Sequence, residues 1–231
     1  MALFCVKITE NVNKDKRMTI KKFFVILIFP ILVGLIQIPT LGELLWSNET
    51  THNVNYGAHL AVSVGSFLVL AVFSLLIYKW LGGTSIDWTN WSWKIIGTAV
   101  IAAVLSQAIQ FGLSIITKTP TRDSETLTAL HSCIGSITIL TLLVLSPVLE
   151  EILFQGILQQ EILGKFRPYL AIGITAIIFA LIHGYSLGIG TLELLFSGLA
   201  YALAFWYTDD LKCPMLAHGL SNLIVMILLL W

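Results

Sequence analysis

Charged residues are scarce in this sequence. Asp, Glu, Lys and Arg make up 11% of its 231 residues, against about 25% in an average soluble domain. Hydrophobic residues account for 57%, and the mean hydropathy is +0.88. These values exclude an ordinary soluble domain and predict a polytopic membrane protein. The formal net charge is zero, so the composition gives no indication of a nucleic-acid partner.

Cysteines and several hydrolase motifs are also scarce or absent. The three cysteines, Cys5, Cys133 and Cys213, are far apart and form no CxxC or His-interleaved pattern, so neither a disulfide framework nor a zinc finger is indicated. The chain has no HExxH zinc motif. It also lacks the GxSG serine motif and the GxGD aspartyl motif, because "LFSGLA" (195–200) and "GIGTLE" (188–193) each miss a required residue.

Long apolar segments dominate the rest of the chain. A membrane-spanning helix needs about 20 apolar residues. The apolar segments are 23–41, 57–81, 94–117, 127–146, 148–164, 168–184, 188–207 and 211–231. They predict an all-α, polytopic membrane helix bundle of about eight transmembrane helices. A single helix over 127–164 would be about 57 Å long against a hydrocarbon core of about 30 Å, so we expect a break at Pro147.

The chain divides into three parts: a basic N-terminal arm (1–22), N-terminal transmembrane helices (23–126) and a C-terminal helical core (127–231). The arm carries six Lys and Arg residues, whereas the next loop (43–56) carries only acidic charges. The positive-inside rule therefore predicts a cytoplasmic N-terminus and an uncleaved first span. In an eight-span arrangement Lys165 and Arg167 would fall outside the cell. The composition suits a bacterial plasma membrane.

A few ionisable side chains lie inside the apolar segments, where they are costly and often functional. The candidates are Glu150, Glu151, His183, Glu193 and His218, together with Asn222. Structural interpretations stay open for each of them. The glutamates can favour a helix N-terminus through the macrodipole, as can Glu193. His183 can be a helix-end histidine, and His218 with Asn222, four residues apart on one helix face, can be an interhelical hydrogen-bonded pair.

In the eight-span arrangement, Glu150 and Glu151 begin one span at the cytoplasmic side and His183 ends the next span at that side. Such a set supplies the parts for hydrolysis: a glutamate base, a histidine that shares the water, and donors for an oxyanion. The same residues could bind a divalent metal such as zinc. The sequence does not separate these two schemes.

Three motifs carry a family resemblance. "EEILFQG" (150–156), "FALIH" (179–183) and "HGLSN" (218–222) resemble the EExxxR, FxxxH and HxxxN/D motifs of the CPBP family. This family comprises CAAX prenyl endopeptidases and bacteriocin-processing enzymes, and is also called the type II CAAX protease or Abi family. The resemblance covers roughly residues 127–231, which we therefore expect to be the catalytic core.

The resemblance implies an intramembrane protease with a cytoplasm-facing cavity. In that picture Glu150 is the general base, His183 helps to hold the water, and Glu151 supports the site. His218 and Asn222 stabilise the oxyanion. No cofactor is expected, although zinc stays open, and the partners are a peptide or lipidated-protein substrate and membrane lipids. The sequence does not indicate the oligomeric state.

One departure from the family pattern bears on activity. Gln155 replaces the arginine that usually ends the first motif, and glutamine can hydrogen-bond a carboxylate but not neutralise it. A noncatalytic bacteriocin-immunity or scaffold protein with the same fold is therefore the alternative function. A proton-coupled transporter is a third hypothesis, disfavoured by the lack of an internal repeat.

Overall fold

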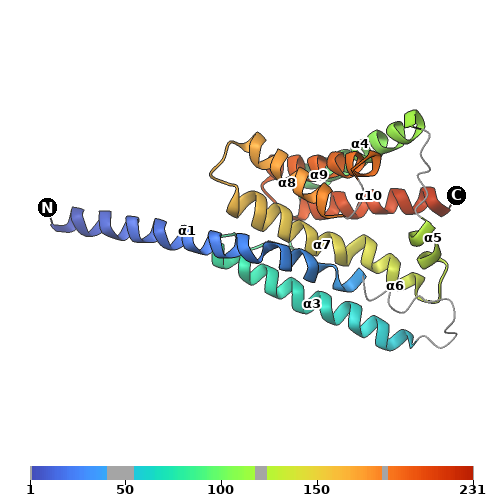
Figure 1. Cartoon of the computed structure of the whole chain (residues 1–231), viewed down its shortest axis with the longest axis horizontal. Coiled ribbons are helices and arrows are strands. Elements are labelled where there is room, and N and C mark those ends of the chain that lie inside the picture. The colour runs from blue at the N-terminus through green and yellow to red at the C-terminus, as the bar shows by residue number, and fades with distance from the viewer. Residues whose placement is uncertain (1, 41–54, 118–123, 184–186, 231) are drawn as a thin grey trace.

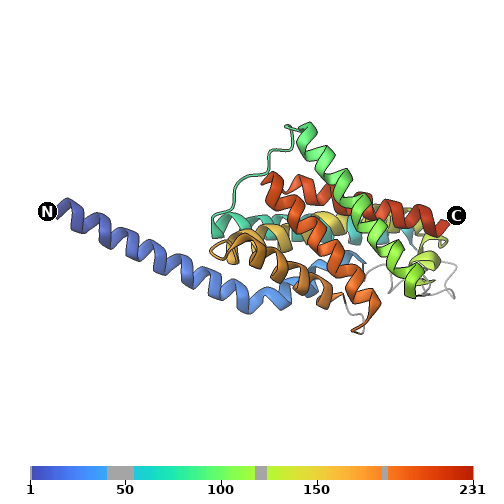
Figure 2. The same ribbon diagram turned by 90° about the horizontal axis from the view of Figure 1, so that it is seen from above.

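The computed structural model describes residues 2–40, 55–117, 124–183 and 187–230, and every regular element among them is a helix. The helices are α1 (Ala2–Ile36), α3 (Tyr56–Leu81), α4 (Trp93–Thr117), α5 (Ser124–Leu130), α6 (Gly135–Leu140), η1 (Thr141–Leu145), α7 (Ser146–Glu151), η2 (Ile152–Ile162), α8 (Pro168–Ile182), α9 (Ile189–Thr208) and α10 (Lys212–Leu230). They pack as one bundle, from which the N-terminal half of α1 projects (Figures 1 and 2). The predicted all-α bundle is confirmed.

Six helical stretches in the described ranges are long and apolar enough to cross a membrane. They are Met18–Thr40, Tyr56–Leu81, Trp93–Thr117, Gly135–Ile162, Ile189–Thr208 and Lys212–Leu229. A seventh apolar helix, Pro168–Ile182, is shorter. The bundle therefore has fewer full spans than the eight segments suggested, chiefly because 127–146 and 148–164 do not form two separate spans.

The predicted break at Pro147 is wrong. Helices α6, η1, α7 and η2 follow one another without a gap and form the single span Gly135–Ile162. Pro147 lies in the first turn of α7, directly after the π-helical turn η1, in which the Ser146 N–H donates to the Thr141 carbonyl. The wider i→i−5 register brings the chain past the proline without ending the helix, as π-helical turns often do near functional sites.

Because Gly135–Ile162 is one span and not two, the loops after it lie at the opposite end of the bundle from that expected. Lys21 donates to the Trp80 carbonyl (2.9 Å), and the Tyr78 hydroxyl donates to Gln160 (2.6 Å), so α1, α3 and η2 meet there. The Lys and Arg residues with described side chains are Lys21, Lys22, Lys79, Lys94, Lys165, Arg167 and Lys212. Lys21 and Lys22 lie near the start of the span Met18–Thr40, and the others lie in loops and helix ends at the same end of the bundle, hereafter the cationic end. The earlier placement of Lys165 and Arg167 opposite Lys21 is therefore wrong.

Aromatic side chains connect the elements around the centre of the bundle. Phe154 of η2 packs edge-on against Phe29 of α1 (6.0 Å) and Phe179 of α8 (5.2 Å). Phe179 in turn packs against Tyr201 of α9 at 6.0 Å. The outer faces of the helices expose large apolar side chains, including Val69 (69%) and Ile116 (79%). Such an exposed apolar surface suits lipid rather than water, and the chain is an integral membrane protein.

Candidate active site

Four ionisable side chains from three helices meet inside the bundle. Glu150 and Glu151 come from α7, His183 is the C-cap of α8, and His218 lies on α10. At 1.5 Å per residue, the two glutamates lie roughly 20 Å from either end of the span Gly135–Ile162. The expectation that they begin a span is wrong, because the helix continues through Pro147. The macrodipole explanation for these carboxylates therefore does not apply.

The first pair is Glu150 and His183. The Ser146 hydroxyl donates to Glu150 Oε1 at 2.5 Å, while Glu150 Oε2 lies 3.5 Å from His183 Nε2. His183 Nδ1 lies 2.6 Å from the Phe179 carbonyl oxygen, which can only accept a hydrogen bond. Nδ1 therefore carries a proton, and Nε2 is the nitrogen that faces the carboxylate. Glu150 is 5% exposed, whereas the His183 side chain is 21% exposed.

The second pair is Glu151 and His218. His218 Nδ1 lies 2.9 Å from Glu151 Oε1, and Gln155 donates to Glu151 Oε2 at 2.6 Å. Glu151 is fully buried. The His218 ring stacks on Tyr201, with centroids 4.7 Å apart and planes at 17°. The Glu151 carboxylate and the Tyr201 ring together fix the orientation of the His218 imidazole. The hydrogen bond to Glu151 uses Nδ1, so Nε2 is not involved in it.

Asn222 lies one helical turn beyond His218 and does not join the four ionisable residues through a hydrogen bond. Its Nδ2 donates to the Leu142 backbone carbonyl at 2.7 Å. The structure thus brings together four of the five predicted site residues and places Asn222 beside them. Its role as an oxyanion donor stays a prediction.

The surroundings of the pairs include residues that the motifs did not point to. Ser146 is four residues before Glu150, a spacing that places both on one helix face and that the sequence could have revealed. Tyr201 carries no comparable signal. Gln155 occupies the position of the family arginine and bonds Glu151 as an amide, while its Oε1 is buried without a hydrogen-bond partner.

Glu193 lies apart from both pairs. The first turn of α9 contains no acidic residue, so the expectation that Glu193 opens this helix is wrong. Its side chain instead lines a pocket of about 370 Å³ with Gln107, Gln110 and residues of α10.

A metal site is not formed by these residues as they are placed. Catalytic zinc takes three protein ligands and a water. Across the residues that the structure describes, no group of three or more His, Cys, Asp and Glu side chains could hold a metal ion. His218 Nδ1 and Glu151 Oε1 bind each other.

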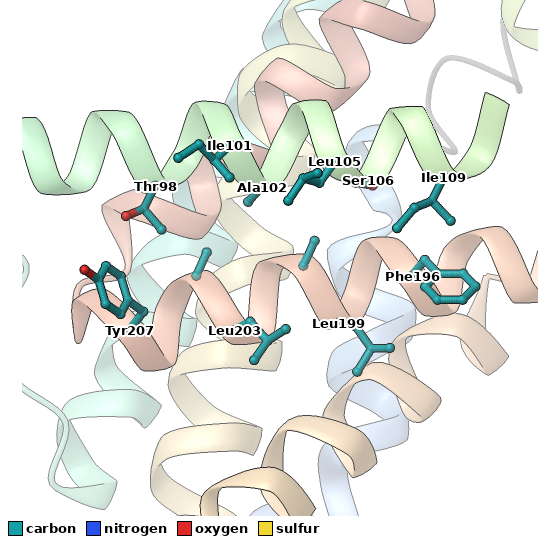
Figure 3. A pocket seen from close by; sticks show the side chains of 12 residues that line it. Thr98, Ile101, Ala102, Leu105, Ser106, Ile109, Phe196, Leu199, Leu203 and Tyr207 are labelled. Atoms are coloured by element: carbon teal, nitrogen blue, oxygen red, sulfur yellow. The ribbon is translucent and has the colours of Figure 1, made fainter. Parts of the chain in front are cut away.

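A separate apolar pocket of about 370 Å³ lies between α4 and α9. Side chains of both helices line it, among them Ile101, Leu105, Leu199 and Leu203 (Figure 3). Its lining contains no charged residue, and neither glutamate pair contributes to it. This pocket suits hydrocarbon, and the polar chemistry belongs to the buried pairs.

The fold and these pairs define a polytopic helical membrane protein with a buried carboxylate and histidine centre. Residues 132–224 match the family model described as type II CAAX prenyl endopeptidase Rce1-like. That segment contains all five predicted site residues, and the predicted resemblance to CAAX-type proteases is confirmed over it.

A relative of the whole chain gives the same class. The chain is 26% identical over 221 residues to the Bacillus subtilis (strain 168) protein named "Putative membrane peptidase YdiL", covering 89% of this chain and 88% of that protein. No solved structure matches the chain. Both matches indicate a membrane peptidase.

Proposed function

We propose that this protein is an intramembrane endopeptidase that hydrolyses a peptide bond of a membrane-associated or lipidated substrate through water activated by Glu150. The family match and the relative support the peptidase class. The observation that carries the mechanism is the arrangement of the first pair. Glu150 Oε1 is bound by Ser146, whereas Oε2 lies 3.5 Å from His183 Nε2.

The attacking water binds beside this pair, within hydrogen-bond reach of both Glu150 Oε2 and His183 Nε2. Glu150 accepts one proton as the water oxygen adds to the carbonyl carbon of the scissile bond. The same proton then passes to the leaving amine as the C–N bond breaks, which leaves a carboxylic acid and an amine. Burial favours this chemistry, because water excluded from the site cannot screen the charges that move during the reaction.

The second pair stabilises the charge that develops on the carbonyl oxygen. Glu151 accepts a hydrogen bond from His218 Nδ1, and the other ring nitrogen, Nε2, is the group that donates to the oxyanion in this scheme. Gln155 holds the other oxygen of Glu151 and fixes the carboxylate. In this scheme Glu151 orients His218 and does not contact the substrate.

We propose the cytoplasm for the cationic end. Seven described Lys and Arg side chains lie there, and residues 2–22 of the arm belong to the N-terminal part of α1, which projects from the bundle at that end. Trp80, Trp88, Trp91 and Trp93 also belong to it and are exposed, as expected of rings at the headgroup level. This orientation, in a bacterial plasma membrane, leaves the catalytic pairs at mid-depth in the bilayer.

The test is cleavage of a fluorogenic panel by the detergent-purified protein, with farnesylated CAAX peptides, the same peptides without lipid, and leader peptides. Glu150→Gln should lower the cleavage rate at least 10²-fold, as is typical for loss of a general base. His183→Ala should act in the same direction. The matched control is Glu161→Gln, which lies in the same continuous span Gly135–Ile162, hereafter the long helix. This variant should cleave at the wild-type rate.

Other results would contradict the proposal. Equal losses in Glu150→Gln and Glu161→Gln would show that any charge change on this helix impairs the protein. Loss of wild-type activity in chelator, restored by zinc, would replace activation by glutamate alone with metal chemistry. No cleavage by the wild type, but cleavage by Gln155→Arg, would favour the noncatalytic alternative.

A further inference from the structure

The proline in the long helix leaves a carbonyl without its backbone donor. In the π-helical turn η1, the Ser146 N–H donates to the Thr141 carbonyl five residues earlier. Continued by one residue, this register would join the N–H of residue 147 to the Leu142 carbonyl. Residue 147 is a proline and has no N–H. An unpaired carbonyl inside a membrane protein is costly, because no water is at hand to replace the bond.

The side chain of Asn222 takes the place of that donor. Its Nδ2 donates to the Leu142 carbonyl at 2.7 Å. One turn earlier on α10, Gly219 lies against the next carbonyl, because a Cβ built there would stand 2.5 Å from Leu143 O. Helix α10 therefore contacts the long helix at the carbonyls of Leu142 and Leu143, which lie five and four residues before Pro147.

This contact fixes α10 at the level of the site. Asn222 follows His218 by four residues and shares its helix face. A slide of α10 by one residue would move His218 about 1.5 Å, enough to lose its 2.9 Å contact with Glu151. The Asn222 bond holds the helix at one register and so holds His218 on Glu151.

We propose that Asn222 is a positioning residue: its amide replaces the hydrogen bond that Pro147 removes and thereby locks α10 in the register that joins His218 to Glu151. Only the consequence for cleavage rests on the proposed function. This role is distinct from that of an oxyanion donor: the Nδ2–H that binds Leu142 acts on the register of α10 and, through it, on His218.

The experiment is a double-mutant cycle between Asn222→Ala and Pro147→Ala, read first as the thermal unfolding midpoint of the purified protein. Alanine at 147 restores a backbone N–H. In either α or π register the Leu142 carbonyl then has a backbone donor, from residue 146 or 147. Asn222→Ala should therefore lower the midpoint in the wild-type chain and have much less effect in Pro147→Ala. The matched control is Ser221→Ala, which removes a buried hydroxyl of the same helix but not the donor to Leu142, so its effect should not couple to Pro147.

The position of His218 is read by nitrogen NMR of histidine-labelled protein, with the signal assigned from His218→Gln. Asn222→Ala should shift the ring nitrogens away from the values of a carboxylate-bound imidazole, and the double variant should return them. If Asn222→Ala alone cannot be purified, recovery of folded protein when Pro147→Ala is added would equally support the proposal. Failure of the double variant alongside a folded Pro147→Ala would overturn the proposal.

Cleavage kinetics separate this proposal from the proposed function. On any peptide that the wild type cleaves, Asn222→Ala should lower kcat by tenfold or more at unchanged KM, and Pro147→Ala should restore most of the loss. An equal kcat loss in both backgrounds, with the midpoint and the His218 signal unchanged, would instead identify an oxyanion donor. If no peptide is cleaved, the proposed function fails while the unfolding cycle and the NMR signal still decide the role of Asn222.

Discussion

Replacing Gly219 with alanine is the most direct perturbation of the contact between α10 and the long helix. An ideal Cβ at this position would lie 2.5 Å from the Leu143 carbonyl oxygen, whereas real Cβ atoms essentially never come within 3.0 Å of a heavy atom. The oxygen belongs to the backbone and cannot rotate away. One of the two helices must therefore move, and His218 moves with α10.

The expected magnitude follows from opposing effects. Alanine favours a helix over glycine by about 1 kcal/mol. Overpacking costs about 1–3 kcal/mol, and loss of the hydrogen bond between Asn222 and Leu142 costs about 0.5–1.5 kcal/mol. Gly219→Ala should therefore destabilise the protein by about 0.5–3.5 kcal/mol. Cleavage should fall as well, because a shift of α10 moves His218 and lengthens its 2.9 Å contact with Glu151.

The chain supplies matched controls for this substitution. Gly97 in α4 has no atom within 4 Å of its ideal Cβ, so Gly97→Ala should raise stability by up to about 1 kcal/mol. Gly198 is intermediate, since its Cβ would lie 3.1 Å from Ala176 Cα. The assay is reversible unfolding in detergent, followed by tryptophan fluorescence. If Gly219→Ala unfolds at or above the wild-type midpoint while Gly97→Ala is raised, the packing argument is refuted.

Three further substitutions test other contacts. Gln155→Met removes the donor to Glu151 Oε2, and we expect cleavage to fall by tenfold or more, because charged hydrogen bonds contribute about 1.5–3 kcal/mol; unchanged kinetics would contradict this. Lys212→Met should expose loop 82–92 to limited proteolysis, because the buried ammonium donates to the Asp87 and Asn90 carbonyls; a loop that stays protected would show that other contacts hold it. Tyr78→Phe removes the bond to Gln160 and should lower the free energy of unfolding by about 1 kcal/mol, and a loss well above this in chemical denaturation would point to repacking.

The apolar segments predicted the helical class because hydropathy reports directly on which stretches avoid water. They did not predict the continuity through Pro147. A proline rule that considers only the α-helix breaks the chain there, whereas the π-helical turn and the side chain of Asn222 keep it intact. The donor comes from a residue 80 positions away, and a local pattern carries no information about it.

The sequence also predicted part of the candidate site. Intramembrane charges and motif spacing singled out Glu150, Glu151, His183 and His218, because carboxylates and imidazoles are rare in apolar helices. The sequence did not predict which glutamate lies beside which histidine. That Glu150 faces His183 while Glu151 faces His218 depends on how α8 and α10 pack on the long helix. Tyr201, which stacks on His218, resembles any other core aromatic residue in sequence.

The short helix α8 has a consequence for the access of water. Its 15 residues rise about 22 Å, against a hydrocarbon core of about 30 Å. Leu170, Ile177 and Leu181 are exposed along its outer face, so lipid lies against it. A helix this short ends inside the hydrocarbon core, where its C-cap His183 lies beside Glu150. In the proposed orientation, water therefore crosses only part of the bilayer to reach Glu150.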